Sequence, residues 1–329
     1  MRRLSATFAA IVVSVLIVAG CGSPQQDGEP AADQVTYLTA FGAVGRDAFA
    51  WVALEKGYFR DAGLDVTIQL GAATGENLKV MAAGRAQFSN LDLTGTWILA
   101  GKGQYTDVRA IAAIHQRSLV SIVSLEGSGI TAPRLLEGHR MGAATGSVNQ
   151  LLFPAYARLA GIDPEKVTIV DAQPAQLAAL LASGRVDALS TFLIGVRGVE
   201  KAAGGRRTVV LPYSDYLPDL FGNGIITTAA IARDRPELAE RFRDAALKGL
   251  AYAMEHPDEA AQIMKKAQPA ADVTAAVGEI ELMAPYVKSS GVIERSRVEK
   301  ALGTLHDAGL IPAGVPADAV VDFDLAPGS

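Results

Sequence analysis

The residue types of this 329-residue chain favour binding chemistry over catalysis. Its four histidines are widely spaced, and none has another histidine or a cysteine at the spacing of metal ligands. The single cysteine, Cys21, excludes an internal disulfide framework and any cysteine-rich zinc or iron–sulfur site. The sequence lacks the motifs of zinc proteases, serine hydrolases and P-loop nucleotide hydrolases. We therefore expect no enzymatic activity, no metal and no cofactor.

Two stretches in the first third of the chain carry candidate ligand contacts. After the first expected strand, the loop FGAVGRD offers Phe41 for stacking on a planar ligand and Arg46 for pairing with an anion. Asp47, in the same loop, is placed either to contact the ligand or to cap the helix that follows. Asp92 stands at the end of another expected strand, where its carboxylate can accept hydrogen bonds from an amino group. The alternative for Asp92 is a turn or cap residue ahead of Thr94.

A third candidate stretch precedes an expected helix that begins at Val148. Thr145, Gly146 and Ser147 place backbone N–H groups and hydroxyls at the N-terminus of this helix. Such an end favours negative or electron-rich groups of a ligand. The alternative is that Ser147 only caps the helix. Asn149 adds an amide group close to the same end.

The remaining candidates come from the second half of the chain. Thr191 and Phe192 end an expected strand, and Phe192 and Phe221 are placed either to clamp a ring or to pack in the core. Asn223 lies in a return segment broken by prolines, which we expect to form part of a hinge. These residues complete the set of predicted solute contacts.

Alternating strand and helix patterns must position these side chains. The patterns predict strands over residues 35–39, 64–70, 86–91, 108–114, 140–144, 167–170 and 186–189. They predict helices over residues 48–55, 76–83, 148–160, 175–182 and 237–253, with a C-terminal third that is helical. This alternation indicates an α/β fold with mostly parallel sheets covered by helices.

An internal similarity links two of the candidates. Residues 78–92 (LKVMAAGRAQFSNLD) and 177–192 (LAALLASGRVDALSTF) both read as an Ala/Leu-rich helix, a Gly-Arg turn and an apolar strand. We interpret each as one helix–strand unit of its own lobe, which puts Asp92 and Phe192 at equivalent strand ends. Ligands of open α/β sheets bind beyond the carboxyl ends of the strands, so these two ends are expected to face each other. A chance similarity between Ala-rich segments is the alternative.

The N-terminus predicts the compartment. Two arginines followed by an apolar run over residues 6–19 indicate a signal peptide covering residues 1–20. The sequence VAG directly before Cys21 resembles a bacterial lipoprotein box, which implies cleavage before that cysteine and a lipid on its thiol. The alternative is an uncleaved anchor with an incidental cysteine. Residues 21–34 then form a tether, and we expect an extracytoplasmic protein anchored to the bacterial cell membrane.

The charge of the chain argues against one class of partner. Its formal net charge is −5, whereas a nucleic-acid-binding protein is expected to present a basic surface. We therefore expect no nucleic-acid partner.

Five segments in the same order resemble a known family. The chain is similar to periplasmic solute-binding proteins of the nitrate/sulfonate/taurine and thiamine-precursor (SsuA/THI5-like) group. The segments are WVALEKGYFRDAGLDVTI (51–68), GENLKVMAAGRAQF (75–88), RMGAATGS (140–147), LAGIDPEKVTIVDAQPAQLAALLASGRVDAL (159–189), and NGIITT followed by RPELAERFRDAALKGLAYAMEHPDEAAQIM (235–264). They are spread over residues 51–264, so the resemblance extends over most of the chain after the predicted signal peptide.

The resemblance implies a two-lobed type II periplasmic-binding-protein fold with two mixed sheets flanked by helices. Lobe 1 would comprise residues 35–118 and 213–329, and lobe 2 residues 119–212. A small solute would bind in the cleft, the lobes would close about a hinge, and an ABC permease would receive the solute. We expect a monomer, because the two lobes supply their own cleft.

The resemblance leaves the solute open, because the family includes both heterocycle and anion binders. Asp47 and Asp92, with Phe41 and Phe192 for stacking, suit a neutral or aminated heterocycle such as a thiamine-pyrimidine precursor. Arg46 and the helix end at 145–147 suit a sulfonate, nitrate or other small anion. We favour the heterocycle, because a carboxylate at Asp92 would repel an anion across a cleft of low dielectric constant.

A synthetic activity is the more remote alternative. The fungal branch of the THI5-like group synthesises a pyrimidine with a cysteine-rich iron motif. With Cys21 as its only cysteine, this chain lacks that motif.

Overall fold

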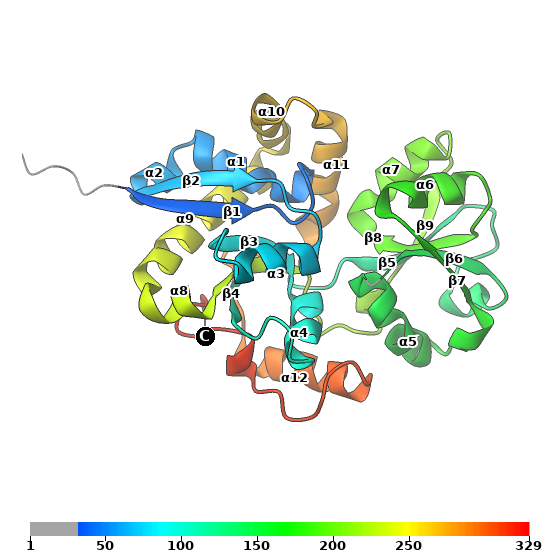
Figure 1. Ribbon diagram of the computed structural model, residues 1–329. Helices are drawn as coiled ribbons and strands as arrows, with labels where there is room; N and C mark the ends of the chain where they lie inside the picture. Colours follow the sequence, from blue (N-terminus) through cyan, green and yellow to red (C-terminus); the bar gives the residue numbers. More distant parts are fainter. Residues whose placement is uncertain (1–31, 146, 329) are drawn as a thin grey trace, which may run out of the picture. The chain divides into compact units, whose positions relative to one another are not determined.

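The computed structural model describes residues 32–145 and 147–328, whose strands form two five-stranded mixed sheets (Figure 1). The first sheet has the order β2-β1-β3-β10-β4 and contains β1 (Asp33–Leu38), β2 (Leu64–Gln69), β3 (Phe88–Asp92), β4 (Val108–Ala113) and β10 (Asn223–Thr228). The second has the order β7-β6-β8-β5-β9 and contains β5 (Val120–Leu125), β6 (Arg140–Ala144), β7 (Thr168–Ala172), β8 (Ala188–Phe192) and β9 (Thr208–Pro212). The predicted signal peptide, Cys21 and Gly146 lie outside the described residues, as does most of the predicted tether.

The two sheets share one plan. The central strand β3 pairs in parallel with β1 and antiparallel with β10, and the central strand β8 pairs in parallel with β6 and antiparallel with β5. In each sheet four of the five strands run in one direction, so the expectation of mostly parallel sheets is confirmed. β10 or β5 runs against the other four, which confirms the mixed sheets implied by the resemblance. β5 and β10 are the first strands that the chain forms after crossing from one sheet to the other. Each enters its sheet against the direction of the central strand.

Five helices lie where the sequence pattern predicts them, within a few residues. They are α1 (Ala48–Glu55), α3 (Thr74–Ala82), α5 (Val148–Ala160), α6 (Pro174–Ala182) and α9 (Pro236–Glu255). The other α-helices are α2 (Tyr58–Asp61), α4 (Leu93–Gly101), α7 (Val196–Ala202), α8 (Ala229–Asp234), α10 (Pro257–Ala267), α11 (Val273–Met283) and α12 (Arg295–Asp307). Within the described part of the chain, no helix has both the length and the apolar character that a membrane crossing requires.

The apolar face of α9 holds the central strand of the first sheet in place. The ring of Phe242 stacks on Phe88 of β3 with centroids 3.9 Å apart and on Phe59 of α2 at 5.2 Å. Two turns further along, a Cβ atom at Gly249 would stand 2.4 Å from the carbonyl oxygen of Phe49. Only glycine therefore lets α9 approach α1 this closely.

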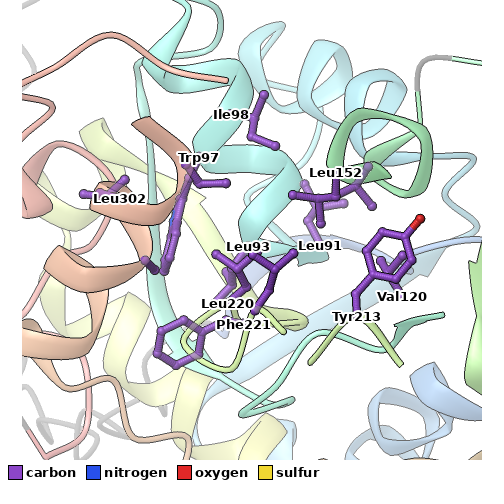
Figure 2. Close-up of a cluster of buried hydrophobic side chains, with 14 of the residues drawn as sticks. Leu91, Leu93, Trp97, Ile98, Val120, Leu152, Tyr213, Leu220, Phe221 and Leu302 are labelled. Carbon is purple, nitrogen blue, oxygen red and sulfur yellow. The ribbon is translucent and has the colours of Figure 1, made fainter. Parts of the chain in front are cut away.

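One buried cluster contains residues from both sheets (Figure 2). Leu91, at the end of β3, and Leu93 and Ile98 of α4 belong to it, together with Val120 of β5 and Leu152 of α5. All five side chains are almost completely buried. The apolar contact near the end of β3 is therefore continuous with the core beneath the second sheet.

Two connections join the sheets, residues 114–119 between β4 and β5 and residues 213–222 between β9 and β10. They are hydrogen-bonded to each other: Gly222 N donates to His115 O at 3.1 Å, and Ser118 N donates to Leu220 O at 2.8 Å. A Cβ atom at Gly222 would lie 2.8 Å from the His115 Cβ, so the close approach requires glycine. The chain thus passes between the sheets twice at one place.

Candidate functional site

Asp92 ends β3 directly before α4, and its two carboxylate oxygens have different surroundings. Oδ1 accepts a hydrogen bond from Gly95 N at 2.7 Å, which makes Asp92 the N-cap of α4. Oδ2 is buried and has no hydrogen-bond partner. Burial raises the pKa of Asp92 to about 6, against the opposing influence of the Gly95 N–H group and the Arg46 guanidinium. One oxygen therefore fulfils the predicted capping role, and the other is an unpartnered acceptor.

Asp47 is completely buried, and its carboxylate accepts hydrogen bonds from three residues. Oδ1 accepts from Tyr37 OH at 3.1 Å, Ala40 N at 3.0 Å and Asn90 Nδ2 at 3.0 Å, and Oδ2 also accepts from Ala40 N, at 3.1 Å. Of the two alternatives for Asp47, the helix cap is wrong: Asp47 stands before α1, but its side chain accepts no hydrogen bond from the first turn of the helix. Its carboxylate instead anchors β1, the following loop and β3 to one another.

Arg46 is the cation at this end of the first sheet, and only 11% of its side chain is exposed. Its guanidinium lies 5.3 Å from the centre of the Phe192 ring, which comes from the second sheet. Its Nε atom is buried without a hydrogen bond and stands 3.9 Å from Asp47 Oδ2. Its backbone N–H donates to Glu279 Oε2 of α11 at 3.4 Å. Arg46 thus connects three separate parts of the chain.

Carboxyl groups outnumber guanidinium groups around Arg46. The positive charge of the Arg46 guanidinium acts to lower the pKa of Asp47, Asp92 and Glu279. Burial raises the pKa of Glu279, as it raises the pKa of both aspartates. Three carboxyl groups against one guanidinium disfavour an additional anion and favour a group that donates hydrogen bonds.

The second sheet contributes neutral polar groups. Ser147 caps α5 by accepting a hydrogen bond from Gln150 N, as the capping alternative predicts, and Thr145 is exposed. Asn149, in the first turn of α5, is 4% exposed, and its Oδ1 has no partner. Ser190 Oγ on β8 donates to the backbone oxygen of Asn149 at 3.1 Å and lies 3.0 Å from Tyr213 OH.

The charged residues of the first sheet and the neutral polar residues of the second approach each other where α4 and α5 begin. A Cβ atom placed on Gly95 of α4 would lie 3.4 Å from Asp92 Oδ1 and 3.4 Å from the Cβ of Val148 in α5. Asp92 at the start of α4 and Asn149 in the first turn of α5 therefore lie at neighbouring helix N-termini. α4 follows β3 of the first sheet, and α5 follows β6 of the second. Arg46 and Phe192 form a second contact between the two groups.

The remaining residues that were predicted to contact the solute differ in burial and in the contacts they make. Phe221 is completely buried, edge-on to Trp97 at 5.5 Å and 4.0 Å from the Arg297 guanidinium, which is the core packing given as its alternative (Figure 2). Asn223 is buried at the start of β10, where its backbone N–H donates to His115 Nδ1 at 3.2 Å. Phe41 is 43% exposed. Thr191 and Phe192 are half-buried at the end of β8.

Three residues near this region were not among the predicted contacts. Asn90 precedes Asp92 by two positions and therefore lies on the same face of β3, and its Oδ1 is buried without a partner. Tyr156 of α5 stacks on Tyr213 at 4.1 Å, and its OH is also unpartnered. His115 is buried, and burial lowers its pKa to about 3, so it stays neutral. All five residues of β3 are buried, so no alternation in the sequence marks Asn90, and the other two residues also depend on tertiary contacts.

No group of three or more His, Cys, Asp or Glu side chains in the described ranges is close enough to hold a metal ion. A cavity of about 380 Å³ lies beside α12 and the loop that follows it. Its lining includes none of the residues discussed above, so it is separate from the region where the sheets meet.

Comparisons with known proteins are consistent with this arrangement. The sequence model of the family described as NMT1/THI5 like matches residues 47–260. The formylaminopyrimidine-binding protein of Halalkalibacterium halodurans is 26% identical over 256 residues, covering 78% of this chain and 77% of its own length. The riboflavin-binding protein RibY of Chloroflexus aurantiacus is 23% identical, covering 82% of this chain and 75% of its own length. The periplasmic aliphatic sulphonate binding protein SsuA of Escherichia coli has the same fold, with a TM-score of 0.71 at 15% identity, covering 89% of this chain and 92% of its own.

Proposed function

This chain belongs to the NMT1/THI5-like family, and we propose that it is an extracytoplasmic solute-binding protein that delivers a small solute to an ABC importer. The solute binds where the ends of β3 and β8 approach each other. Two lobes, residues 35–118 with 213–329 and residues 119–212, close over it about the paired connections at 114–119 and 213–222. This is the hinge closure that two-lobed binding proteins use. The closed form then docks on the permease.

The solute we propose is a neutral or aminated nitrogen heterocycle related to the pyrimidine of thiamine. The observation that carries this choice is Asp92 Oδ2, a buried carboxylate oxygen without a hydrogen-bond partner. An amino group of the solute would donate to it, and an unmatched buried acceptor is costly enough to reject solutes that lack such a group. Two of the similar proteins are named for binding a formylaminopyrimidine and a flavin, both of which are nitrogen heterocycles.

A small sulfonate or other anion is the second candidate. The buried Arg46 Nε without a hydrogen bond favours it, because that N–H group would donate to an anionic oxygen. The excess of carboxyl groups around Arg46 weighs against it, since an anion would have to approach Asp92 in a buried setting.

We also propose that the protein acts without catalysis, as a monomer, tethered to the bacterial membrane through a lipid on Cys21. The absence of a cysteine-rich iron motif from the sequence and the binding-protein names of the relatives support a transport role over synthesis. A Cys21→Ala protein tests the tether. It should incorporate no labelled fatty acid, whereas the wild-type protein should; incorporation without the cysteine would contradict a lipid on Cys21.

Calorimetric titration tests the solute class. The wild-type protein should bind an aminopyrimidine and fail to bind a small alkanesulfonate. Asp92→Asn should weaken binding of the aminopyrimidine roughly ten- to a hundredfold, because a hydrogen bond to a buried charge becomes a neutral one. Unchanged affinity in Asp92→Asn would remove the basis for the heterocycle. Binding of the sulfonate alone would establish the second candidate.

A further inference from the structure

The carboxylate of Asp47 fixes the orientation of the Asn90 amide. Asp47 Oδ1 already accepts from Tyr37 OH and Ala40 N, and it accepts from Asn90 Nδ2 at 3.0 Å. An acceptor in this position requires the NH₂ group of Asn90 to face it, because the carbonyl oxygen of the amide has no proton to donate. The Asn90 Oδ1 atom must therefore face away from Asp47.

The outward-facing oxygen of Asn90 is buried and has no partner. Asn90 is completely buried, and Oδ1 forms no hydrogen bond, although the other end of the same amide is well bonded. Buried amide oxygens in folded proteins nearly always have a partner, so an oriented and unmatched one indicates a place for a donor. Asn77 of α3 shows the ordinary case. Its Oδ1 accepts from Ala72 N at 3.0 Å, and its Nδ2 donates to Thr39 O at 2.8 Å.

Two of the other buried unmatched groups, on Asp92 and Asn149, are also acceptors, whereas Arg46 Nε is an unmatched donor. Asp92 Oδ2 lies on the same face of β3, two residues further along, and its partner oxygen Oδ1 is held by Gly95 N. Asn149 Oδ1 stands at the start of α5, next to the Val148 side chain that meets Gly95. Each of the three side chains therefore presents an oxygen, and two of them have their other polar atom fixed by a hydrogen bond.

We propose that Asn90 is a specificity-determining residue that accepts a hydrogen bond from an N–H or O–H group of the solute, and that Asp47 is the positioning residue that orients it. The proposal rests on the solute-binding function proposed above and refines it. The solute would present donors to Asn90 and Asp92 along one edge, next to β3, and a further donor towards Asn149. A solute of the same shape that carries methyl groups or acceptors on that edge would leave buried oxygens unmatched.

A ratio of affinities tests this without requiring the natural solute. The probes are an aminopyrimidine and the methylpyrimidine in which a methyl group replaces the amino group. We expect the wild-type protein to prefer the aminopyrimidine at least tenfold, since a site built around hydrogen bonds rejects an analogue that lacks the donor. Asn90→Ser keeps a hydroxyl to donate to Asp47 but withdraws the acceptor, and Asn90→Leu removes both. The preference should fall severalfold in each variant.

Matched controls separate recognition from folding. Asn77→Ser removes a buried amide whose two ends are both partnered within the protein, so it should lower the melting temperature and leave the preference unchanged. Asp47→Asn replaces the obligate acceptor with an amide and frees Asn90 to turn, so the preference should fall here as well. If Asn90→Leu does not fold, Asn90→Ser alone carries the test.

The outcomes distinguish the two proposals. A preference that is undiminished in Asn90→Ser, with the protein folded, would overturn the role of Asn90 and leave the proposed function standing. A preference that is undiminished in Asp47→Asn would overturn the positioning role of Asp47. A wild-type protein that binds neither pyrimidine would overturn the proposed solute class, and the assignment of Asn90 with it.

Discussion

The central strands of the two sheets end in equivalent places but carry different chemistry. β3 ends in Asn90, Leu91 and Asp92, next to the buried Arg46 and Asp47. β8 ends in uncharged Ser190, Thr191 and Phe192. Both strands sit at the middle of sheets with the same plan of parallel and antiparallel neighbours. If the solute binds between these strand ends, as we propose, the first sheet would supply charged groups to it and the second neutral polar and aromatic groups.

The local structure after β3 and β8 explains why the last residue of each strand, Asp92 or Phe192, has a different role. Asp92 caps α4, which begins at the next residue, so one carboxylate oxygen is fixed at the end of the strand. Phe192 cannot cap, and β8 is followed by a short 3-10 turn (Leu193–Gly195) before α7 begins. The ring of Phe192 is left to pack against both cores and beneath the Arg46 guanidinium.

The largest effect on stability is expected in the buried cluster that contains residues from both sheets. Leu152 of α5 is completely buried in the cluster that contains Leu91 and Leu93 (Figure 2). Leu152→Ala should lower the free energy of unfolding by about 2–5 kcal/mol, the usual cost of such a cavity. Leu159 on the same helix is 53% exposed, and Leu159→Ala should cost less than about 0.5 kcal/mol. Urea denaturation measures both, and equal small effects would show that the two ends do not share a core.

The charged end should make stability depend on pH through Asp92. The folded-state pKa of Asp92 is raised from 3.8 to about 6, so the unfolded chain releases this proton first as the pH rises. Stability should therefore fall between about pH 4 and pH 6 and level off above, by roughly 3 kcal/mol at most. Asp92→Asn retains the capping oxygen and cannot ionise.

The variant should show a flatter profile than the wild type over that interval and greater stability at neutral pH. The other buried carboxyl groups, Asp47 and Glu279, are present in both proteins, so the difference between the two profiles isolates Asp92. Denaturation curves at several pH values provide the measurement. Parallel profiles would mean that Asp92 is not buried as a charge.

A smaller effect is expected for the contact between the two ends. Arg46 lies 5.3 Å from the Phe192 ring centre, and such cation–π pairs contribute about 0.5–1 kcal/mol. A double-mutant cycle of Arg46→Met and Phe192→Leu should give a coupling energy of that size in thermal or urea unfolding. A coupling energy near zero would indicate that the strand ends are not in contact in solution.

The smallest effect is expected at the surface between α7 and α11. Arg197 Nη2 lies 2.9 Å from Glu281 Oε2, and both side chains are about half exposed. Exposed pairs of this kind are worth at most about 1 kcal/mol. Arg197→Glu should lower stability slightly, and adding Glu281→Arg should restore it. The same exchange at Glu76 and Lys79, which both lie on α3, provides the control within a single helix. Failure of the exchange to restore stability would contradict a direct pair.

The sequence predicts local elements of this fold better than its long-range contacts. The bounds of α5 and β6 agree with the predicted ranges, because both segments have clear start and stop residues. α4 was not predicted, since its first six residues are all buried and show no amphipathic period. The antiparallel entry of β5 and β10 was not predicted either, because pairing between strands distant in sequence leaves no local signal.

The candidate site shows the same limit. The repeat of a Gly-Arg turn and a strand identified the ends of β3 and β8, and the capping pattern identified Asp92 and Ser147. Asn90 was missed because an isolated asparagine in an apolar strand resembles any other strand residue. Asp47 was expected either to contact the ligand or to cap a helix, and only the tertiary approach of Tyr37 and Asn90 shows why its carboxylate is buried among hydrogen-bond donors.

The most direct test of the account is a crystal structure of the protein with a bound aminopyrimidine. The account predicts the ring between the ends of β3 and β8, with its amino group within hydrogen-bond distance of the Asp92 carboxylate. A ring bound elsewhere, such as in the cavity beside α12, or bound between the strand ends with its amino group turned away from Asp92, would contradict it.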